Sequence, residues 1–255
     1  MSYDDIAALR YARAESRPDS FSLRLAPRLV RLFGADPVRS GQPLRLLDIG
    51  AGTGQVADVL RSAGFSTVSL DVSLPMLKLR TSAASNTPGV AVVGDATALP
   101  FGSKFDLITA TFNVLNHLPD LDAASQMVGE VGRLLAPGGR FVFDINTRIG
   151  LEATGRTSSH ETGPGGSTTW TRHWIGPDRL RLRASGPFND GSQWHYYDET
   201  IDKIVVPCAD IEHWCLQAGL GTLRWFTDDL VTSIKDPEQH AVAFGIARVS
   251  NDHEA

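Results

Sequence analysis

The sequence is short of cysteine, of positive charge and of long apolar runs, and each shortage argues against a class of protein. Its two cysteines, Cys208 and Cys215, lie seven residues apart in a segment of helical character and lack the paired spacing of metal ligands. We interpret them as reduced core thiols and expect no metal site. The net charge is -5 and the arginines are scattered. Because phosphate backbones are bound by clustered positive charge, we expect no nucleic-acid partner.

The apolar runs are all shorter than the roughly 18 residues that a membrane-spanning helix requires. The first residues, M-S-Y-D-D, also lack the basic region and apolar core of an export signal. We therefore expect no membrane partner and a cytoplasmic location. The 255 residues, 42% of them hydrophobic, suffice for one large domain or for a domain with an insertion.

A glycine-rich turn joins an apolar run to a segment that can form a helix. Residues 46–54 read L-L-D-I-G-A-G-T-G, with Gly50, Gly52 and Gly54 at alternate positions. Glycines permit positive φ and leave no Cβ between the backbone and a ligand. The following helix would present free N–H groups at its start. The stretch therefore predicts a site for a nucleotide-like ligand.

The spacing of these glycines separates two kinds of nucleotide site. The dinucleotide fingerprint G-x-G-x-x-G needs a glycine at position 55, which is Gln55 here. Asp48, ahead of the first glycine, suits a ligand that carries an ammonium group rather than a pyrophosphate. The stretch resembles the first motif of class I S-adenosylmethionine-dependent methyltransferases, E/D-x-G-x-G-x-G. A Rossmann-type oxidoreductase is the competing interpretation of this motif alone.

Acids that end the next predicted strands extend the resemblance. Asp71 follows a predicted strand over residues 65–70. In both dehydrogenases and methyltransferases, an acid at the end of this strand accepts hydrogen bonds from the ribose diol. The sequence D-V-S-L-P-M-L from Asp71 is similar to the methyltransferase pattern D-x-S-x-x-M-L, which places Met76 on the adenine face. The resemblance implies that Asp95 accepts a hydrogen bond from the adenine amino group and that the backbone N–H of Ala96 donates one to a ring nitrogen of adenine.

Two helices are predicted near the start of the chain, over residues 4–15 and 20–33. The resemblance implies that this segment folds over the cofactor, and that an aromatic or an arginine from it meets the methionine carboxylate. Tyr11 and Arg17 are the candidates; the alternative is that they are exposed residues of a mobile terminus. The residues expected to bind S-adenosylmethionine, and S-adenosylhomocysteine as product, are Asp48, Gly50, Gly52, Gly54, Asp71, Val72, Met76, Asp95, Ala96, Thr111 and Arg17.

The segment after the fourth predicted strand indicates the chemistry. Nucleic-acid amino-methyltransferases have N/D-P-P-Y/F there, whereas residues 112–118 read F-N-V-L-N-H-L. This resembles the F-x-x-I/L-x-H-L stretch of small-molecule methyltransferases that act on amino groups of nucleotide-linked sugars, which implies that His117 faces the substrate. An imidazole titrating near neutrality is suited to accept the proton of an amine. Tyr11 and His195 are weaker candidates, and a capping or packing role for His117 is the alternative.

Later motifs complete the expected sheet. The turn P-G-G at residues 137–139 and the strand after it, which runs into F-D-I-N-T, are similar to the fifth-strand region of a bacterial small-molecule subgroup. Residues 241–249 would form the antiparallel strand that distinguishes methyltransferase sheets from dehydrogenase sheets. We expect an α/β fold: a doubly wound, Rossmann-like, seven-stranded sheet.

Residues 150–206 interrupt this core with a different pattern. Segments 168–175, 179–185 and 193–205 alternate like antiparallel strands, without helices. The resemblance implies a meander that shapes the substrate pocket and can pair subunits as a homodimer. The predicted parts are therefore a helical lid (1–36), a cofactor-binding core (37–149), the insertion (150–206) and the rest of the core (207–255). The subgroup's E-x-H-x-Q pattern appears as E-T-I-D-K from Glu199 to Lys203, without the histidine and the glutamine. This departure leaves the identity of the substrate open.

The predicted function is methyl transfer from S-adenosylmethionine to a small-molecule acceptor, which we expect to be an amine nitrogen of a secondary metabolite or nucleotide sugar. O-methylation with the same histidine is the close alternative. A cyclase or binding protein that does not methylate, on the same fold, is the alternative from a different class. A nicotinamide oxidoreductase is a more distant one.

Overall fold

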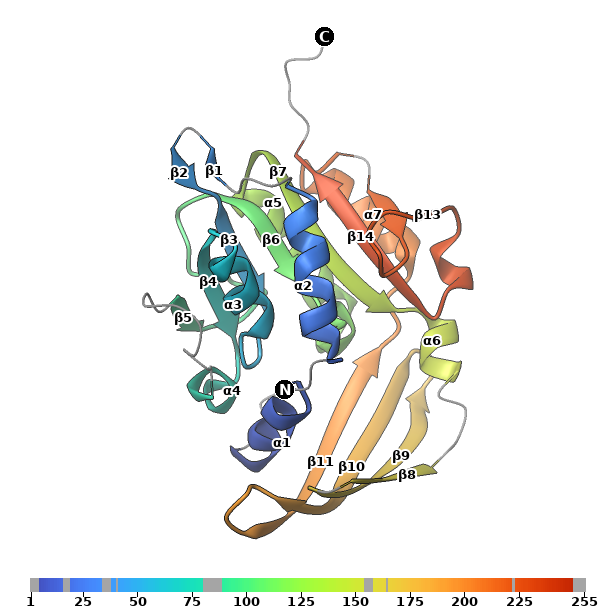
Figure 1. Ribbon diagram of the computed structural model, residues 1–255. Coiled ribbons are helices and arrows are strands. Elements are labelled where there is room, and N and C mark those ends of the chain that lie inside the picture. The colour runs from blue at the N-terminus through green and yellow to red at the C-terminus, as the bar shows by residue number, and fades with distance from the viewer. Residues whose placement is uncertain are drawn as a thin grey trace.

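A computed structural model of the chain describes residues 5–15, 19–33, 38–39, 41–79, 89–153, 158–163, 165–221 and 223–249. A large, mostly parallel sheet lies between two layers of helices, and a second, antiparallel sheet extends beyond one end of it (Figure 1). The helices are α1 (Asp5–Glu15), α2 (Phe21–Arg31), α3 (Gln55–Ser62), α4 (Leu74–Lys78), α5 (Leu121–Leu134), α6 (Arg148–Ala153) and α7 (Cys208–Gln217), with 3-10 turns η1 (Val114–His117) and η2 (Pro237–Gln239).

The large sheet has the strand order β13-β12-β14-β7-β6-β3-β4-β5. Its strands are β3 (Arg45–Ile49), β4 (Ser66–Asp71), β5 (Val90–Val93), β6 (Phe105–Ala110), β7 (Leu135–Asn146), β12 (Arg224–Phe226), β13 (Ser233–Ile234) and β14 (Val242–Arg248). The five strands from β3 to β7 run parallel, whereas β14 pairs antiparallel with β7. This confirms the predicted doubly wound sheet with an antiparallel strand near its edge. The short edge strand β13, which the sequence did not predict, makes the sheet eight-stranded rather than seven-stranded.

Both faces of the large sheet are covered because its central strands carry apolar side chains on both sides. Leu46 of β3 packs with α2 and α3 on one face, whereas Leu47 belongs to the cluster that α5 and α7 cover on the other face. Side chains such as these are fully buried. Each contributes about 1.5–3 kcal/mol relative to exposure. Cys208 and Cys215 of α7 are buried in the second cluster as free thiols, as predicted.

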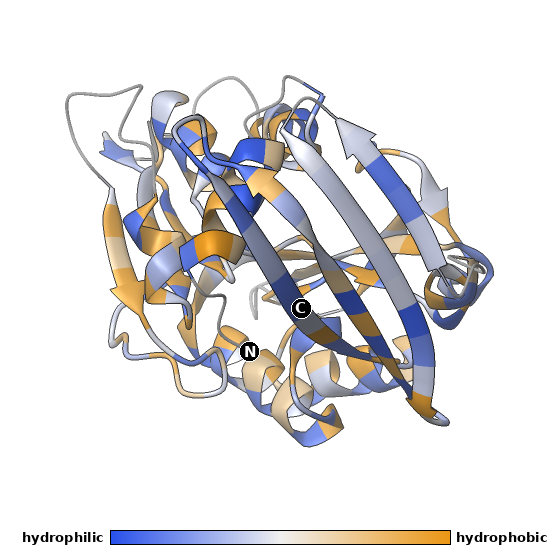
Figure 2. Cartoon of the chain, turned by 90° about the horizontal axis from the view of Figure 1, so that it is seen from below, coloured by the Kyte–Doolittle hydropathy of each residue, from blue (hydrophilic) through white to orange (hydrophobic). Residues whose placement is uncertain are grey.

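The second sheet has the order β11-β10-β9-β8. It consists of β8 (Ser158–Gly163), β9 (Gly166–Gly176), β10 (Arg179–Asn189) and β11 (Trp194–Ile204), whereas the far end of the core carries the short pair β1 (Val38–Arg39) and β2 (Gln42–Pro43). Every second residue of β10 is buried from Leu180 to Phe188; Figure 2 shows the chain from below, coloured by residue hydropathy. On one face Leu182 and Ile201 are buried; on the other Arg181 is paired with Asp202 at 2.7 Å. The predicted meander is therefore present, but it has a fourth strand, β8. The helix α6, absent from the prediction, precedes it.

Asn116 of η1 ties the second sheet to the core. Its side-chain Nδ2 donates to the carbonyl oxygens of Asn146 (3.0 Å) and Ile204 (2.9 Å), and its Oδ1 accepts from the N–H of Asn146 (2.8 Å). Asn116 is fully buried, so these bonds satisfy polar groups that would otherwise lack partners. The ends of β7 and β11 are thereby fixed beside η1.

Gly245 of β14 provides a test of the sheet packing. A Cβ at this position would lie 2.2 Å from Cζ of Phe143, which stacks on Phe141 and meets Trp225 edge-on. We expect Gly245→Ala to lower the free energy of unfolding by about 1–3 kcal/mol, because the added methyl overpacks the core. Urea denaturation measures the change. Gly102→Ala is the matched control, since nothing lies within 4 Å of that Cβ position; equal destabilisation of both variants would contradict the packing explanation.

Candidate active site

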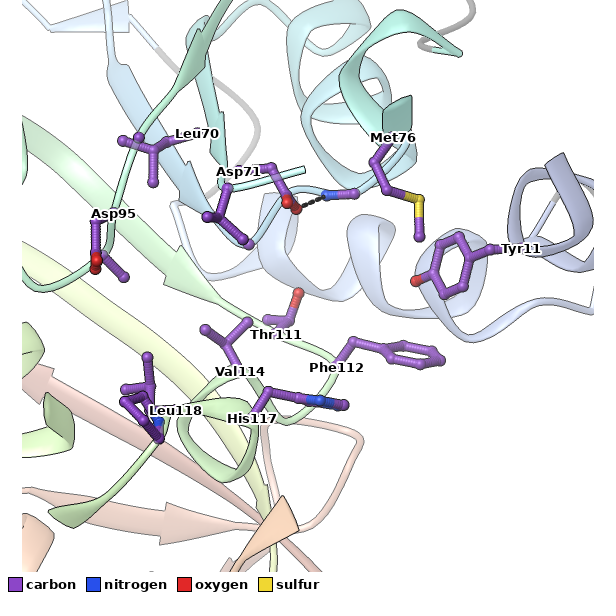
Figure 3. Close-up of a pocket in the computed structure, with 16 residues that line it drawn as sticks. Tyr11, Leu70, Asp71, Met76, Asp95, Thr111, Phe112, Val114, His117 and Leu118 are labelled. Carbon is purple, nitrogen blue, oxygen red and sulfur yellow. Dashed lines mark hydrogen bonds between the residues drawn. The ribbon is translucent and has the colours of Figure 1, made fainter. Parts of the chain in front are cut away.

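A cavity of about 310 Å³ opens at the carboxyl ends of β3, β4 and β6 (Figure 3). Most of the predicted site residues line it: Tyr11, Gly50, Gly52, Asp71, Val72, Met76, Asp95, Ala96, Thr111 and His117. Six further residues line it: Leu70, Gly94, Phe112, Val114, Leu118 and Pro119. Doubly wound folds bind their ligands at this end of the sheet.

The glycine loop forms one wall of the cavity. Gly50, Gly52 and Gly54 have φ of 66°, 56° and 80°, a backbone conformation that residues other than glycine rarely adopt. A Cβ on Gly50 would lie 2.6 Å from Cγ2 of Val114, and a Cβ on Gly52 would lie 3.5 Å from the ring of Tyr11. Gly54 begins α3 as its N-cap and is outside the set of lining residues. The loop thus keeps bare backbone on the cavity wall.

The carboxylate of Asp71 is fixed beside this loop. Its Oδ2 accepts from the N–H of Gly52 at 2.7 Å and its Oδ1 accepts from the N–H of Ser73 at 2.8 Å. Burial raises the pKa of Asp71 above its ordinary value, while these two hydrogen bonds oppose the rise. The fixed carboxylate faces the cavity, where its remaining lone pairs can accept from ligand hydroxyl groups.

Asp48 and Asp95 have different surroundings. Asp48 is buried, its Oδ1 accepts from the Thr109 hydroxyl at 2.6 Å, and it is outside the set of residues that line the cavity. Asp95 lies exposed at the rim, where its Oδ1 accepts from the N–H and the hydroxyl of Thr97, both at 2.8 Å. These bonds lower the pKa of Asp95, so its carboxylate is ionised and available to an amino group.

The helix α1 brings Tyr11 over the glycine loop. The Tyr11 ring meets Phe112 edge-on, with centroids 5.7 Å apart, and Phe112 meets Phe21 of α2 at 5.2 Å. On its other side α1 is held to the second sheet, because Arg10 pairs with Glu199 of β11 at 2.8 Å. The helix therefore bridges the cofactor side of the cavity and the inserted sheet. Arg17, the other predicted contact from this segment, lies outside the described residues.

The turn that follows β6 has an unusual backbone. Phe112 and Asn113 have φ of 69° and 53°, a left-handed conformation that is costly for residues other than glycine. The buried carboxylate of Asp144 holds this turn, since Oδ1 accepts from the N–H of Phe112 at 2.6 Å and Oδ2 from the N–H of Asn113 at 3.0 Å. Burial raises the pKa of Asp144 to about 7, against the effect of these bonds and of nearby Lys203.

His117 lines the cavity from η1, but it does not titrate as the sequence suggested. Burial, and next the positive charge of Lys203, lower the pKa of its imidazole to about 3. The expectation that this imidazole titrates near neutrality is therefore wrong. The sequence could not reveal the shift, because both of its causes are tertiary contacts. Near pH 7 His117 is neutral; one ring nitrogen can accept a hydrogen bond while the other donates one.

Lys203 lies beside the left-handed turn and affects the pKa of His117, a role that the sequence did not reveal. It extends from β11, and its Nζ donates to the side-chain oxygen of Asn113 at 2.7 Å. Burial lowers the pKa of Lys203 to about 8, and the neighbouring Asp144 opposes this effect. In the sequence, Lys203 was visible only as a departure from the subgroup's glutamine.

His195, a weaker catalytic candidate, lies elsewhere. Its Nε2 is 2.7 Å from Oδ2 of Asp190, within the hairpin that joins β10 to β11, and it is not among the lining residues. Among the described residues, no three histidines, cysteines or acids come together to hold a metal ion. No helix in the described part of the chain is long and apolar enough to cross a membrane.

The fold and the cavity define a methyltransferase-type nucleotide site, and comparisons with known proteins agree. Residues 47–143 match the family described as "Methyltransferase domain". The ubiquinone/menaquinone biosynthesis C-methyltransferase UbiE of Rhodopseudomonas palustris is 36% identical over 207 residues, covering 77% of this chain and 73% of that protein. The chain therefore belongs to the class I S-adenosylmethionine-dependent methyltransferase family.

A further relative shares about half of its length with this chain, and two solved structures share nearly all of theirs. A demethylmenaquinone methyltransferase of Renibacterium salmoninarum is 33% identical over 141 residues, so the chain spans about half of that relative, 55% of each protein being covered. A methyltransferase structure from Clostridium acetobutylicum superposes with a TM-score of 0.80 at 20% identity, covering 95% of this chain and 97% of that one. The amino pentose methyltransferase CalS10 of Micromonospora echinaspora superposes with a TM-score of 0.68 at 17% identity, covering 98% of each chain. These two structures share the fold of this chain.

The electrostatic effect of Lys203 on His117 can be measured. We expect Lys203→Met to raise the pKa of His117 above about 3, because removing a nearby cation favours the imidazolium ion. In the unaltered protein, the stabilisation that a neutral His117 gives is present above its ordinary pKa of 6.5 and is lost as the pH falls towards 3.

NMR titration of the histidine ring signals, with His117→Gln to assign the resonance, follows this change. Lys235→Met removes an exposed lysine as the control. An unchanged His117 titration in Lys203→Met would mean that burial alone sets this pKa.

Proposed function

We propose that this chain transfers the methyl group of S-adenosylmethionine to a small-molecule acceptor held between the cavity and the second sheet. One observation carries the proposal: the glycine loop lines the same cavity as two acids, Asp71 at the end of β4 and Asp95 after β5. When bound, S-adenosylmethionine supplies an activated methyl group and leaves as S-adenosylhomocysteine.

The residues of the cavity fit an adenosine-containing ligand. The Asp71 carboxylate would accept from the ribose hydroxyls, and the ionised Asp95 at the rim would accept from the adenine amino group. Met76, buried and lining the cavity, offers a polarisable side chain for the adenine face. Gly50 and Gly52 line the cavity without a Cβ, so a ligand can approach their backbone.

Two acceptor atoms have support. The F-x-x-L-x-H-L stretch, and the likeness in fold to an amino pentose methyltransferase, favour an amine nitrogen. The relative named as a ubiquinone/menaquinone biosynthesis C-methyltransferase favours carbon. In either case the chain has to align the acceptor with the methyl group and exclude water.

His117 remains the candidate base on the acceptor side. Because its imidazole is neutral near pH 7, it can accept a hydrogen bond from the acceptor. Its low pKa makes full proton transfer unfavourable while Lys203 is positively charged nearby. His117 is therefore a base only if the bound acceptor changes this electrostatic environment.

Product analysis tests the function. The full chain is incubated with S-adenosylmethionine and a panel of amino sugar nucleotides, reduced naphthoquinones and phenols. We expect S-adenosylhomocysteine to form together with one methylated product, and NMR of that product identifies the methylated atom. Binding of S-adenosylmethionine without turnover of any acceptor would favour the cyclase or binding alternative. Tight binding of NADH without S-adenosylmethionine would contradict the assignment.

The role of Asp71 gives a quantitative prediction. We expect Asp71→Asn to weaken S-adenosylhomocysteine binding by about 10- to 100-fold, because hydrogen bonds to a charged group contribute about 1.5–3 kcal/mol. Isothermal titration calorimetry measures the affinity. Asp122→Asn, at an exposed position of α5, is the control for the loss of one carboxylate. Equal affinities in the Asp71 variant and the unaltered protein would remove Asp71 from the cofactor site.

A further inference from the structure

The face of the second sheet that is turned towards η1 and α1 carries two cations. Lys203 of β11 pairs in register with Leu180 of β10, and Arg172 of β9 pairs with Leu182, two residues further along β10. Lys203 and Arg172 therefore lie on the same face, diagonally across one strand. The positive charge of Arg172 contributes to the lowered pKa of Lys203, in agreement with this placement.

Neither cation is neutralised by a direct ion pair among the described residues. Lys203 donates one hydrogen bond, to an uncharged amide oxygen of Asn113. Arg172 donates from Nη1 to the hydroxyl of Ser159 at 3.2 Å, and its buried Nε has no hydrogen-bond partner in the described structure. A half-buried cation without a paired anion is costly, and so is a buried donor without an acceptor.

Each carboxylate near these cations binds another group through at least one of its oxygens. Asp144 accepts from the two backbone N–H groups of the left-handed turn, and Glu199 pairs with Arg10 at 2.8 Å. The cations Lys203, Arg172 and Arg10 thus outnumber the acids Asp144 and Glu199 beside the face. His117, also close to Lys203, is neutral and adds no charge.

We propose that Lys203 and Arg172 bind an oxyanion of the methyl acceptor. The acceptor is then a molecule with a carboxylate, a phosphate or an ionised hydroxyl group, and an amine acceptor would carry such a group as well. The proposal rests on the methyl-transfer function proposed above. It assigns to the inserted sheet the selection of acceptors by charge, through a lysine at the position where the resembling subgroup has glutamine.

Two sources of the oxyanion are distinguishable. The oxyanion is either a substituent remote from the reacting atom or the ionised hydroxyl of the acceptor itself. Benzoate and its uncharged counterpart benzamide probe the first source, and 4-nitrophenol, whose absorbance reports its ionisation, probes the second. Binding is measured by calorimetry and by absorbance with the full chain, both alone and saturated with S-adenosylhomocysteine.

We expect the unaltered chain to bind benzoate at least about 10-fold more tightly than benzamide, or to lower the apparent pKa of bound 4-nitrophenol, since charge-assisted hydrogen bonds are about twice as strong as neutral ones. Lys203→Gln should abolish the effect, and Arg172→Gln should reduce it. Lys203→Arg should retain it because the charge remains. Lys235→Gln, which removes an exposed lysine, should also retain it.

A benzoate preference assigns the site to a remote substituent, and an effect on 4-nitrophenol alone assigns it to the reacting hydroxyl. The proposal is overturned if the unaltered chain shows neither effect, or if Lys203→Gln retains it while binding S-adenosylhomocysteine normally. If Lys203→Gln does not fold, loss of the effect in the charge-retaining Lys203→Arg would overturn it. Failure of the unaltered chain to bind S-adenosylhomocysteine would instead contradict the proposed methyl transfer, and the probes still report on Lys203.

Discussion

The left-handed turn at Phe112 and Asn113 depends on the Asp144 carboxylate, and the active site depends on this turn. Two residues other than glycine in this conformation cost about 1–3 kcal/mol each. Two hydrogen bonds to the ionised form of this carboxylate contribute about 1.5–3 kcal/mol each, enough to offset that cost. The turn places Phe112 against Tyr11 of the covering helix and directs η1, with Val114, against the glycine loop. One buried carboxylate thus fixes the turn that contacts the glycine loop, the helix α1 and η1 with His117.

The same turn connects the core to the inserted sheet. Asn113 accepts from Lys203, and Asn116 bonds to the ends of both β7 and β11. The insertion follows β7 in the chain and returns through β11 to α7, so both of its junctions meet at η1. A change in the inserted sheet therefore acts directly on the position and the charge environment of His117.

Most of the residues that the sequence singled out as cofactor ligands line the cavity, because the motifs that contain them are local. The glycines, Asp71, Met76 and Asp95 each follow a strand within a short motif, and parallel strands bring their carboxyl ends together. The acceptor side is different, because Lys203 meets Asn113 from 90 residues further along the chain. No motif contains that pairing, which depends on the register of an inserted sheet. His117, which the sequence predicted to face the substrate, lines the cavity. Its low pKa could not be predicted from the sequence because burial and Lys203 cause it. The sequence also did not predict α6 and β8, because the start of the insertion has weaker motifs than the core.

The charges around the turn link acceptor binding to the basicity of His117. Burial raises the pKa of Asp144 to about 7 and lowers that of Lys203 to about 8, and each ionised group favours ionisation of the other. Such a pair titrates as a unit, close to neutral pH. With Lys203 charged, proton uptake by His117 is opposed. An oxyanion held by Lys203 would offset that cation, so the pKa of His117 would rise when the acceptor is in place. On this argument, the lysine that selects an anionic acceptor also opposes protonation of His117 until the acceptor binds, while burial, the larger cause, keeps the pKa of His117 low in either state.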